Sequence, residues 1–438
     1  MRVKDLSARL YRMPPSVRIQ DSIQRVNHWE WIVTTVTTDS GLTGTGFAYT
    51  GGLGGTAIRE LVETYLAPLV RGQDPRDVER VWTRCWWELH SLGSGGLTRY
   101  AIASVDVALW DILAKHAGEP LYRILGGARD KSRAYGSGIN MHLEGEPLLD
   151  QMRGFLDRGY RAVKMKVGRD NPEEDVERVG SVRRLVGPEV LVMLDANQKW
   201  TAGEAIRRAR MLTPFAPFWL EEPVLADDRE AHCRVRQGAG IPLAAGETMY
   251  TRYEFADFLR SGALDVVQAD IVRVGGFTEW LKIAKLAESF NLPVAPHFAM
   301  ELSIHALCAV PNGLILEDLQ GGSFTDLGLL AEPIRSSAAS WRRPPVPATA
   351  SSSTTRRSAA GRSPAGRPTS GRRAAEDRFT SSARWGRTGW CRTRRRSCSS
   401  PAPCTASSAT VSGSSPRARG SRPACRQWPS TASARSRP

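Results

Sequence analysis

The sequence has no apolar run long enough to cross a membrane. A membrane-spanning helix needs about 20 consecutive apolar residues, and polar residues interrupt every apolar stretch of this 438-residue chain well before that length. The first residues, MRVKDLSARLYRMPPS, also lack the apolar centre of a secretory signal. We therefore expect a cytoplasmic protein with no membrane partner.

Cysteine is scarce and irregularly placed. Of the 7 cysteines, Cys85, Cys233 and Cys308 are scattered without the close spacing of a metal-binding motif, and the others all follow residue 390. In a cytoplasmic protein these are expected to be reduced thiols. The fold must then rest on its hydrophobic core, and a chain of this length can bury a large one.

Lysine is absent from residues 334–438. This segment holds 22 Arg against only Glu376 and Asp377, a charge of 22 − 2 = +20. Residues 1–333 hold the remaining 38 basic and 43 acidic side chains, a charge of −5. The net charge of +15 therefore combines a mildly acidic body with a strongly basic tail.

The tail also has almost no Leu, Ile or Val, so it cannot bury a core. We predict that residues 334–438 are disordered, without packed secondary structure, and we hypothesise that they are the product of a frameshift in GC-rich coding sequence. A functional basic tail is the alternative, because clusters such as Arg394 to Arg396 could bind nucleic acid nonspecifically. No aromatic platform accompanies them, so no specific nucleic-acid partner is expected.

Residues 1–125 read as strands followed by helices. Trp29, Trp31, Val33 and Thr35 alternate as on one face of a strand, and a turn signal at residues 39–41 precedes a second run to residue 49. Helical spacing follows at residues 57–70, 77–92 and 100–117. This order predicts an α+β domain.

From about residue 126 to residue 333, short apolar runs alternate with helical patterns. The runs, among them RAVKMKV, VLVML and DVVQ, lack polar alternation, as is typical of parallel strands buried on both faces. Eight such runs occur by Leu316, which is enough to close a barrel. The prediction is an α/β fold, a TIM barrel of (β/α)7β type behind an N-terminal α+β capping domain.

Polar residues end the successive barrel strands. From Lys166 onward they recur every 20 to 29 residues, about one βα unit apart. Side chains at the carboxyl ends of barrel strands converge at one mouth, where barrel enzymes hold their active sites. The residues concerned are Lys164, Lys166, Asp195, Glu221, Glu247, Asp270, His297 and Glu317.

Three adjacent strands end in a carboxylate, at Asp195, Glu221 and Glu247. A single acid at a strand end is more often a helix cap than a ligand, but three in succession form an oxygen-only site. Such a site suits a hard divalent cation and leaves positions for water and substrate. We predict one Mg²⁺ per subunit held by these three residues.

The remaining polar residues are acid and base candidates. Lys166 lies beside Lys164 and the predicted cation, which favours its neutral form and lets it act as a base. Across the mouth, His297 is a second acid or base, oriented by Asp270. Lys164 binds substrate, and Lys164 and Glu317 stabilise the enediolate that forms when a proton α to a carboxylate is removed.

Five short motifs carry a family resemblance: KMK (164–166), LDANQ (194–198), WLEEP (219–223), AAGE (244–247) and PHFAMEL (296–302). Together they resemble the mandelate racemase subgroup of the enolase superfamily, from the N-terminal domain to residue 333. The resemblance implies Glu221 rather than Glu222 as ligand and places Asn197 near the substrate. VQAD and RVGG, around Asp270, look most like acid-sugar dehydratases of the galactarate/talarate kind.

The function expected from this resemblance is dehydration of an acid sugar to a 2-keto-3-deoxy acid. A racemase or epimerase of a 2-hydroxy acid such as mandelate is the alternative, since the reactions differ only after the enediolate. A basic-tailed nucleic-acid-binding protein on an inactive barrel is a third reading. We also expect a small hydroxy acid as substrate, a homo-oligomeric assembly, and specificity from loops near residues 16–26 and 49–55.

Overall fold

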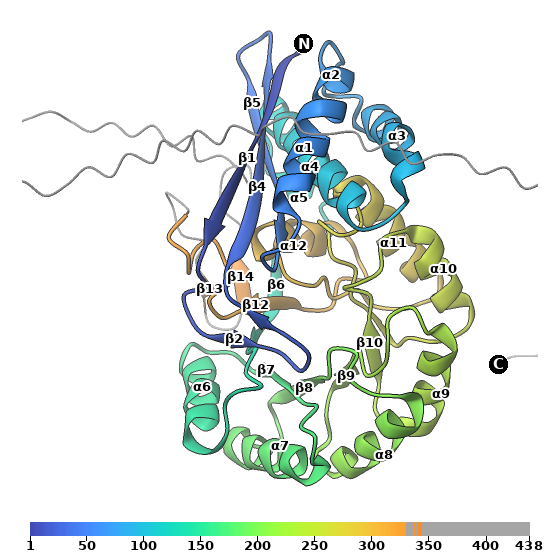
Figure 1. Cartoon of the computed structure of the whole chain (residues 1–438). Helices are drawn as coiled ribbons and strands as arrows, with labels where there is room; N and C mark the ends of the chain where they lie inside the picture. The colour runs from blue at the N-terminus through green and yellow to red at the C-terminus, as the bar shows by residue number, and fades with distance from the viewer. Residues whose placement is uncertain (330–335, 338–339, 343–438) are drawn as a thin grey trace, which may run out of the picture. The chain divides into compact units, whose positions relative to one another are not determined.

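The computed structural model describes residues 1–329, 336–337 and 340–342. The N-terminal residues form an antiparallel sheet with helices, here called the capping domain, and the following residues form a parallel barrel ringed by helices (Figure 1). Within the described part of the chain, no helix is both long and apolar enough to span a bilayer.

The capping-domain sheet has three antiparallel strands in the order β1-β4-β5. The predicted hairpin is its centre, with Trp31 opposite Tyr49 and Val33 opposite Phe47. A separate two-stranded hairpin, β2-β3, lies between β1 and β4 in the chain. The strands are β1 (Val3–Met13), β2 (Ile19–Gln20), β3 (Arg25–Val26), β4 (Trp29–Thr38) and β5 (Thr43–Thr50).

Helices follow the sheet where helical spacing predicts them. They are α1 (Gly55–Glu60), the π-helical η1 (Leu61–Leu66), α2 (Ala67–Val70), α3 (Val78–Leu89), the 3-10 turn η2 (His90–Leu92), α4 (Leu97–Ala117) and α5 (Leu121–Ile124). Helix α4 packs directly on β5 at two glycines. A Cβ at Gly44 would lie 2.1 Å from the carbonyl oxygen of Ala108, and one at Gly46 would lie 2.2 Å from that of Ser104. Only glycine fits this contact.

Seven parallel strands build the barrel over the described residues, and from β6 to β11 each strand pairs with the next one along the chain. They are β6 (Lys131–Ser137), β7 (Ala162–Lys166), β8 (Leu191–Asp195), β9 (Trp219–Glu221), β10 (Leu243–Ala245), β11 (Val266–Val267) and β12 (Leu316–Leu319). Between β11 and β12, Val294 makes single parallel bridges to Val267 and Gly313. Strand β12 pairs with β6 and closes the ring. The predicted barrel is therefore confirmed.

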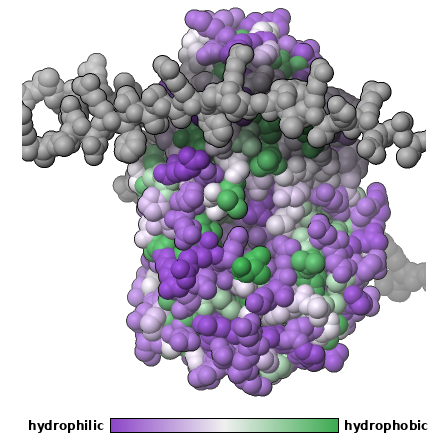
Figure 2. Space-filling model, viewed as in Figure 1, coloured by the Kyte–Doolittle hydropathy of each residue, from purple (hydrophilic) through white to green (hydrophobic). Residues whose placement is uncertain are grey.

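In the described part of the chain, a helix follows each of the first seven strand positions. The helices are α6 (Gly145–Asp157), α7 (Pro172–Val186), α8 (Ala202–Leu212) with the 3-10 turn η3 (Thr213–Phe215), α9 (Arg229–Ala239), α10 (Arg252–Arg260), α11 (Phe277–Ser289) and α12 (Met300–Ala309). Asn171, Thr201 and Thr251 cap α7, α8 and α10 by accepting backbone N–H bonds, which stabilises their first turns. The barrel surface in view is mostly hydrophilic, with isolated apolar side chains (Figure 2).

The barrel interior explains why the polar residues gather at one end. Each of the eight strand positions contributes one residue to a buried cluster: Tyr135, Ala162, Met193, Trp219, Ala244, Val266, Ala295 and Ile315. Side chains alternate along a strand, so the residue two positions on also points inward. At five positions that residue is a predicted site residue: Lys164, Asp195, Glu221, His297 and Glu317. The apolar cluster is thus the floor of the predicted site.

Two short strands correct the prediction that residues 334–438 contain no packed secondary structure. Strand β14 (Ser340–Arg342) pairs with β13 (Ser336–Ser337) and, antiparallel, with β6. The pairing uses residues 131–133 of β6, whereas β12 pairs with β6 from Ala134 onward. An unpaired strand edge can accept any backbone, whatever its side chains, so composition could not reveal this contact. The rest of the predicted tail, and the frameshift hypothesis with it, falls outside the described residues.

Candidate active site

Asp195, Glu221 and Glu247 meet at the barrel mouth. Asp195 lies opposite Glu221 in the pairing of β8 with β9, and Glu247 follows β10 by two residues. One ligand atom from each lies within 4.8 Å of the others, and all three side chains are buried. A buried group of three carboxylates matches the oxygen-rich sites of hard divalent cations.

Glu222 lies outside this group. Its carboxylate accepts hydrogen bonds from Gln198 Nε2 at 3.0 Å and from Thr248 Oγ1 at 2.5 Å. Its φ of 37° places the backbone in the left-handed region, which turns the side chain away from its neighbour. The structure thus groups Glu221, not Glu222, with the other two acids, as the resemblance implies.

Both lysines of β7 point into the mouth and contact these acids. Lys164 Nζ lies 2.6 Å from Glu221 Oε1, 2.8 Å from Glu317 Oε1 and 3.5 Å from Asp195 Oδ2. Lys166 Nζ lies 2.5 Å from Asp195 Oδ2. Lys164 therefore contacts three acids, whereas Lys166 contacts only the Asp195 end of the group.

The charge state of Lys166 depends on the acids around it as well as on Lys164. Burial acts to lower the pKa of Lys166, but the carboxylates of Asp195, Glu247 and Glu221 together outweigh it, and the pKa lies above its ordinary value. The expected lowering by Lys164 is present but smaller. A neutral Lys166 therefore requires that a cation neutralise Asp195, which is consistent with a metal site at this carboxylate.

His297 occupies the opposite end of the group. Its Nδ1 lies 2.7 Å from Asp270 Oδ2, and its Nε2 lies 3.5 Å from Glu247 Oε2. Burial acts to lower the pKa of His297, but Glu247 and Asp270 outweigh it and raise the pKa to about 9. Asp270 Oδ1 accepts backbone N–H bonds from Val272 at 2.8 Å and Arg273 at 3.1 Å, which fixes the carboxylate.

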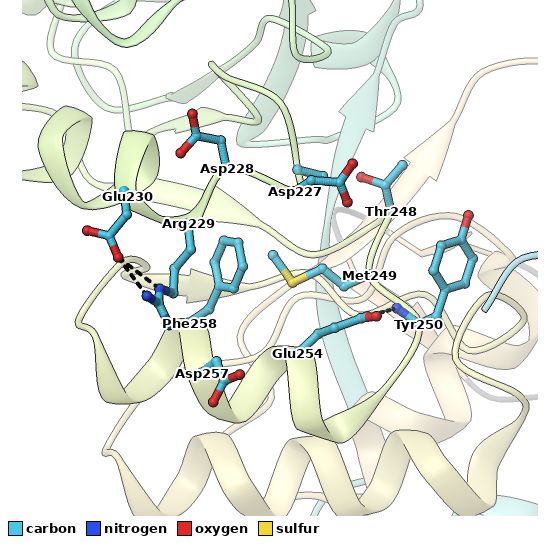
Figure 3. Close-up of a pocket in the computed structure, with 11 residues that line it drawn as sticks. Asp227, Asp228, Arg229, Glu230, Thr248, Met249, Tyr250, Glu254, Asp257 and Phe258 are labelled. Carbon is cyan, nitrogen blue, oxygen red and sulfur yellow. Dashed lines mark hydrogen bonds and ion pairs between the residues drawn. The ribbon is translucent and has the colours of Figure 1, made fainter. Parts of the chain in front are cut away.

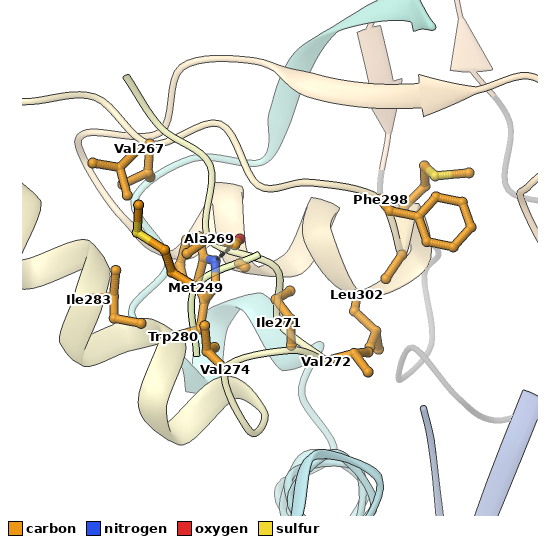
Figure 4. Packing of buried hydrophobic residues seen from close by; sticks show 14 of the residues in the cluster. Met249, Val267, Ala269, Ile271, Val272, Val274, Trp280, Ile283, Phe298 and Leu302 are labelled. Atoms are coloured by element: carbon orange, nitrogen blue, oxygen red, sulfur yellow. Dashed lines mark hydrogen bonds between the residues drawn. The ribbon is translucent and has the colours of Figure 1, made fainter. Parts of the chain in front are cut away.

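Buried apolar residues support both members of this pair. Ile271 and Val272 follow Asp270, Phe298 follows His297, and each is at most 1% exposed. Figure 4 shows these side chains within the packed core beside α11 and α12. The polar pair is therefore set on a tightly packed support.

Glu317 and Asn197 complete the predicted set. Glu317 accepts hydrogen bonds from Ser137 Oγ at 2.7 Å and from the Phe298 backbone N–H at 2.9 Å. The Asn197 backbone N–H donates to Asp195 Oδ1 at 2.9 Å, while its own side-chain oxygen is buried with no partner in the described part of the chain. The structure thus brings together every predicted site residue, and Asn197 keeps an acceptor free for a ligand.

Sequence reasoning missed Tyr49. This residue is buried near the end of β5 in the capping domain, and its hydroxyl donates to Asp270 Oδ2. It begins the loop that the sequence assigns to specificity, but no sequence signal connects it with a residue 221 positions away.

A hollow of about 380 Å³ lies between the loops that follow β9 and β10. It is rich in acids, but Figure 3 shows Glu230 paired with Arg229, and Glu254 accepting from the backbone N–H of Tyr250. Asp228 caps α9. These carboxylates serve local structure and do not converge on one point.

Comparison with known proteins decides the family. Residues 7–126 match the family model described as mandelate racemase/muconate lactonizing enzyme, N-terminal domain, and residues 148–347 match the enolase C-terminal domain-like model. The chain is 38% identical over 309 residues to a 3,6-anhydro-α-L-galactonate cycloisomerase of Streptomyces coelicolor, covering 70% of this chain and 86% of that protein. The chain belongs to the mandelate racemase/muconate lactonizing enzyme family.

Other members of this family are dehydratases. The L-talarate/galactarate dehydratase of Salmonella typhimurium is 36% identical over 285 residues, covering 64% of this chain and 70% of that protein. Two solved structures contain magnesium: a racemase from Streptomyces coelicolor and an L-talarate dehydratase from Polaromonas, the latter also with L-glucarate. The racemase has a TM-score of 0.76 at 36% identity, covering 79% of this chain and 95% of its own. The dehydratase has a TM-score of 0.74 at 33% identity, covering 79% and 94%.

The predicted cofactor agrees with these relatives. They carry magnesium, and the mandelate racemase family fold in this chain presents three buried carboxylates able to hold it. The chain is thus a magnesium enzyme of the enolase superfamily.

Proposed function

We propose that this enzyme removes the proton α to the carboxylate of an acid sugar and then eliminates a hydroxyl group, giving a 2-keto-3-deoxy acid. The observation that carries the proposal is the placement of two acid/base residues at opposite ends of the cluster formed by the Asp195, Glu221 and Glu247 carboxylates. Lys166 contacts Asp195 at one end and His297 contacts Glu247 at the other. A substrate held between them would present one face to each.

The residues divide the reaction between them. Lys166 takes the α-proton, which leaves an enediolate with two negatively charged oxygens. Lys164, whose ammonium lies between Glu221 and Glu317, stabilises that charge. His297 then gives its proton to the hydroxyl on the β-carbon, which leaves as water as the C–O bond breaks and the C=C bond forms. The resulting enol converts to the 2-keto acid.

Asp195, Glu221 and Glu247 would hold the magnesium ion. When bound, it supplies positive charge beside the substrate carboxylate, and so lowers the cost of forming the enediolate. Asn197, with its free side-chain oxygen next to Asp195, is placed to accept a hydrogen bond from a substrate hydroxyl.

Racemisation would use the same residues. If His297 returned a proton to the α-carbon on the face opposite Lys166, the product would be the epimer instead of the keto acid. We favour dehydration because dehydratases of acid sugars recur among the relatives, including L-talarate/galactarate, arabinonate and D-galactonate dehydratases.

A cycloisomerase is the second candidate, because a relative at 38% identity carries that activity in its name. Both reactions can begin with loss of the α-proton, so the site alone does not separate them. Their products do differ, since dehydration removes one water whereas isomerisation keeps the mass of the substrate.

The test is a screen of hexaric and hexonic acids, with 3,6-anhydro-L-galactonate and mandelate included, using the full chain and Mg²⁺. Semicarbazide detects 2-keto products, mass spectrometry reports loss of water, and NMR in D₂O reports α-hydrogen exchange. We expect a 2-keto-3-deoxy acid from at least one sugar acid, and none from the Lys166→Ala variant. A chain that neither exchanges nor converts any of these acids would contradict the proposal.

A further inference from the structure

Tyr49 connects the capping domain with the acid/base pair of the barrel. Its hydroxyl donates a hydrogen bond to Asp270 Oδ2, the oxygen that also contacts His297 Nδ1 at 2.7 Å. The same hydroxyl lies 3.4 Å from His297 Nδ1. Tyr49 is only 3% exposed, so water cannot readily replace this contact. One carboxylate oxygen thus receives a donor from each domain.

The ring of Tyr49 is held as firmly as its hydroxyl. It packs edge-on against Phe298, the residue after His297, at 4.5 Å between centroids. Trp29 of β4 stacks on the same Phe298 ring at 5.2 Å and meets Tyr49 at 6.3 Å. Aromatic pairs at these separations are stabilising beyond the area they bury. The capping-domain sheet therefore contacts both sides of the pair, through Asp270 and through Phe298.

We propose that Tyr49 is a positioning residue for the His297–Asp270 pair, supplied by the capping domain, and that it acts on the histidine side of the reaction alone. The inference rests on the proposed function, in which His297 and Lys166 serve opposite faces of the substrate. With Tyr49 in place, Asp270 Oδ2 is fixed by a second donor, and the imidazole that bonds to it keeps one orientation.

The lysine side has its own supports. Lys166 lies on β7, whose backbone is paired on both edges, with β6 and with β8. Its ammonium contacts Asp195 at 2.5 Å, and its backbone N–H donates to Asn140 Oδ1 at 3.0 Å. None of these contacts includes a residue of the β1-β4-β5 sheet. Loss of the Tyr49 hydroxyl should leave Lys166 where it is.

The test replaces Tyr49 with phenylalanine, which keeps the ring packing and removes only the hydroxyl. The probes are galactarate and L-talarate, acid sugars that are epimers at an α-carbon, with α-hydrogen exchange followed by NMR in D₂O. The Lys166→Ala and His297→Asn variants first identify which epimer depends on which base. For Tyr49→Phe we expect exchange of the histidine-dependent epimer to fall about 10- to 100-fold, the cost of a misplaced catalytic group. Exchange of the lysine-dependent epimer should stay within about threefold of the wild type.

The matched control is Phe47→Leu. Phe47 lies two residues before Tyr49 on β5, is 3% exposed, and packs on Trp31 at 5.7 Å. It should lower thermal stability without favouring one epimer. Equal losses for both epimers in Tyr49→Phe, or no loss for either, would overturn the inference.

A second measurement keeps the inference separate from the proposed function. The NMR signal of the His297 Nδ1 proton, assigned by its absence in His297→Asn, should move downfield in Tyr49→Phe, because Asp270 Oδ2 then keeps one donor instead of two. It should not move in Phe47→Leu. If the wild type exchanges neither acid sugar, the proposed function fails for these probes, and this signal alone decides the role of Tyr49. An unmoved signal would overturn it.

Discussion

The cluster of three carboxylates has Lys166 at one end and His297 at the other, and the two ends are built differently. On the lysine side, Lys164 and Lys166 belong to a strand whose register with β8 is continuous over five residues. On the histidine side, the seventh strand position is reduced to single bridges at Val294. His297 is followed by Phe298 and Ala299, whose φ values of 45° and 42° lie in the left-handed region. The backbone holds the lysines, whereas side chains hold the histidine.

The contrast indicates why the β1-β4-β5 sheet packs against the histidine side, whereas the lysine side is contacted by the β2-β3 segment, where Ser22 Oγ donates to the Val167 carbonyl at 2.6 Å. The backbone of Lys166 is fixed by its pairing with β8 and by the hydrogen bond to Asn140 Oδ1. A residue on a loop with left-handed backbone needs packing to maintain that conformation. Trp29, Tyr49 and Phe298 provide that packing around His297. The histidine side should therefore be the more sensitive to distant change.

The largest expected effect is a loss of exchange on the lysine side and the histidine side alike. Asp195→Asn should lower α-hydrogen exchange on both faces of the substrate by about 1,000-fold or more, because exchange on each face depends on the cation that the three carboxylates bind. Removal of divalent metal with EDTA should do the same, and added Mg²⁺ should restore the wild type only. Asp227→Asn, at an exposed acid in the neighbouring loop, is the control and should be unaffected. Full exchange by Asp195→Asn would exclude this carboxylate as a ligand.

Replacing each base should separate the two sides. Lys166→Ala should lose exchange of one α-configuration by about 100-fold or more, and His297→Asn should lose exchange of the other, since an acid/base group contributes on that scale. Binding, followed by calorimetry with a non-exchanging analogue, should change little. Lys199→Ala, at a partly exposed lysine paired with Asp170, is the control. Loss of the same configuration in both variants would contradict the two-sided site.

A smaller effect should follow from Phe298→Leu. The truncation removes the stacked contact with Trp29 and the edge contact with Tyr49, and should lower the free energy of unfolding by about 1–2 kcal/mol in urea. Exchange that depends on His297 should fall several-fold more than exchange that depends on Lys166. Phe155→Leu truncates an equally buried ring behind Gly136, so it should cost similar stability and weaken both sides alike.

The smallest effect concerns a contact between the capping domain and the barrel that touches neither base. Asp106 of α4 accepts hydrogen bonds from the Thr278 hydroxyl and backbone N–H of α11. Burial raises the pKa of Asp106 from 3.8 to about 7. The folded state thus holds this proton more tightly than the unfolded state, and the associated stability is present below about pH 4 and lost as the pH rises through about 7.

Urea unfolding of wild type and Asp106→Asn at about pH 5 and about pH 8 measures this loss, which is at most about 1.4 kcal/mol per pH unit for one proton. The wild type should lose more stability than the variant over this interval. Both exchange reactions should remain equal to those of the wild type in the variant. A selective loss on the histidine side would show that any contact with the capping domain, and not Tyr49 in particular, controls His297.

The sequence predicted those parts of the site that strand periodicity controls. Asp195, Glu221 and Glu317 end apolar runs one βα unit apart, so the barrel brings them together by its own geometry. Residues 293–296, PVAP, have the same apolar character as the neighbouring buried strands, so the sequence does not distinguish the two isolated bridges at Val294 from an ordinary strand. Tyr49 could not be predicted, since its contact depends on how two domains pack.

The pairing of β14 with β6 could not be predicted for a related reason. Strand β14 pairs through its backbone with residues 131–133, an edge that β12 leaves unpaired, and side-chain composition carries no information about such an edge. The match to the enolase C-terminal domain-like model likewise continues to residue 347, past the predicted end of the barrel.

The two glycines of β5 set a spacing. Gly44 and Gly46 let helix α4 lie against the strand with no side chain between them, and Tyr49 is the third residue beyond Gly46. A single methyl group at either position would push β5 away from α4 and so tilt the end of β5 that carries Tyr49. The absence of side chains at Gly44 and Gly46 therefore helps to determine where Tyr49 lies over the barrel. Substitutions at these glycines, which touch neither substrate nor base, should change how well the enzyme handles one face of its substrate.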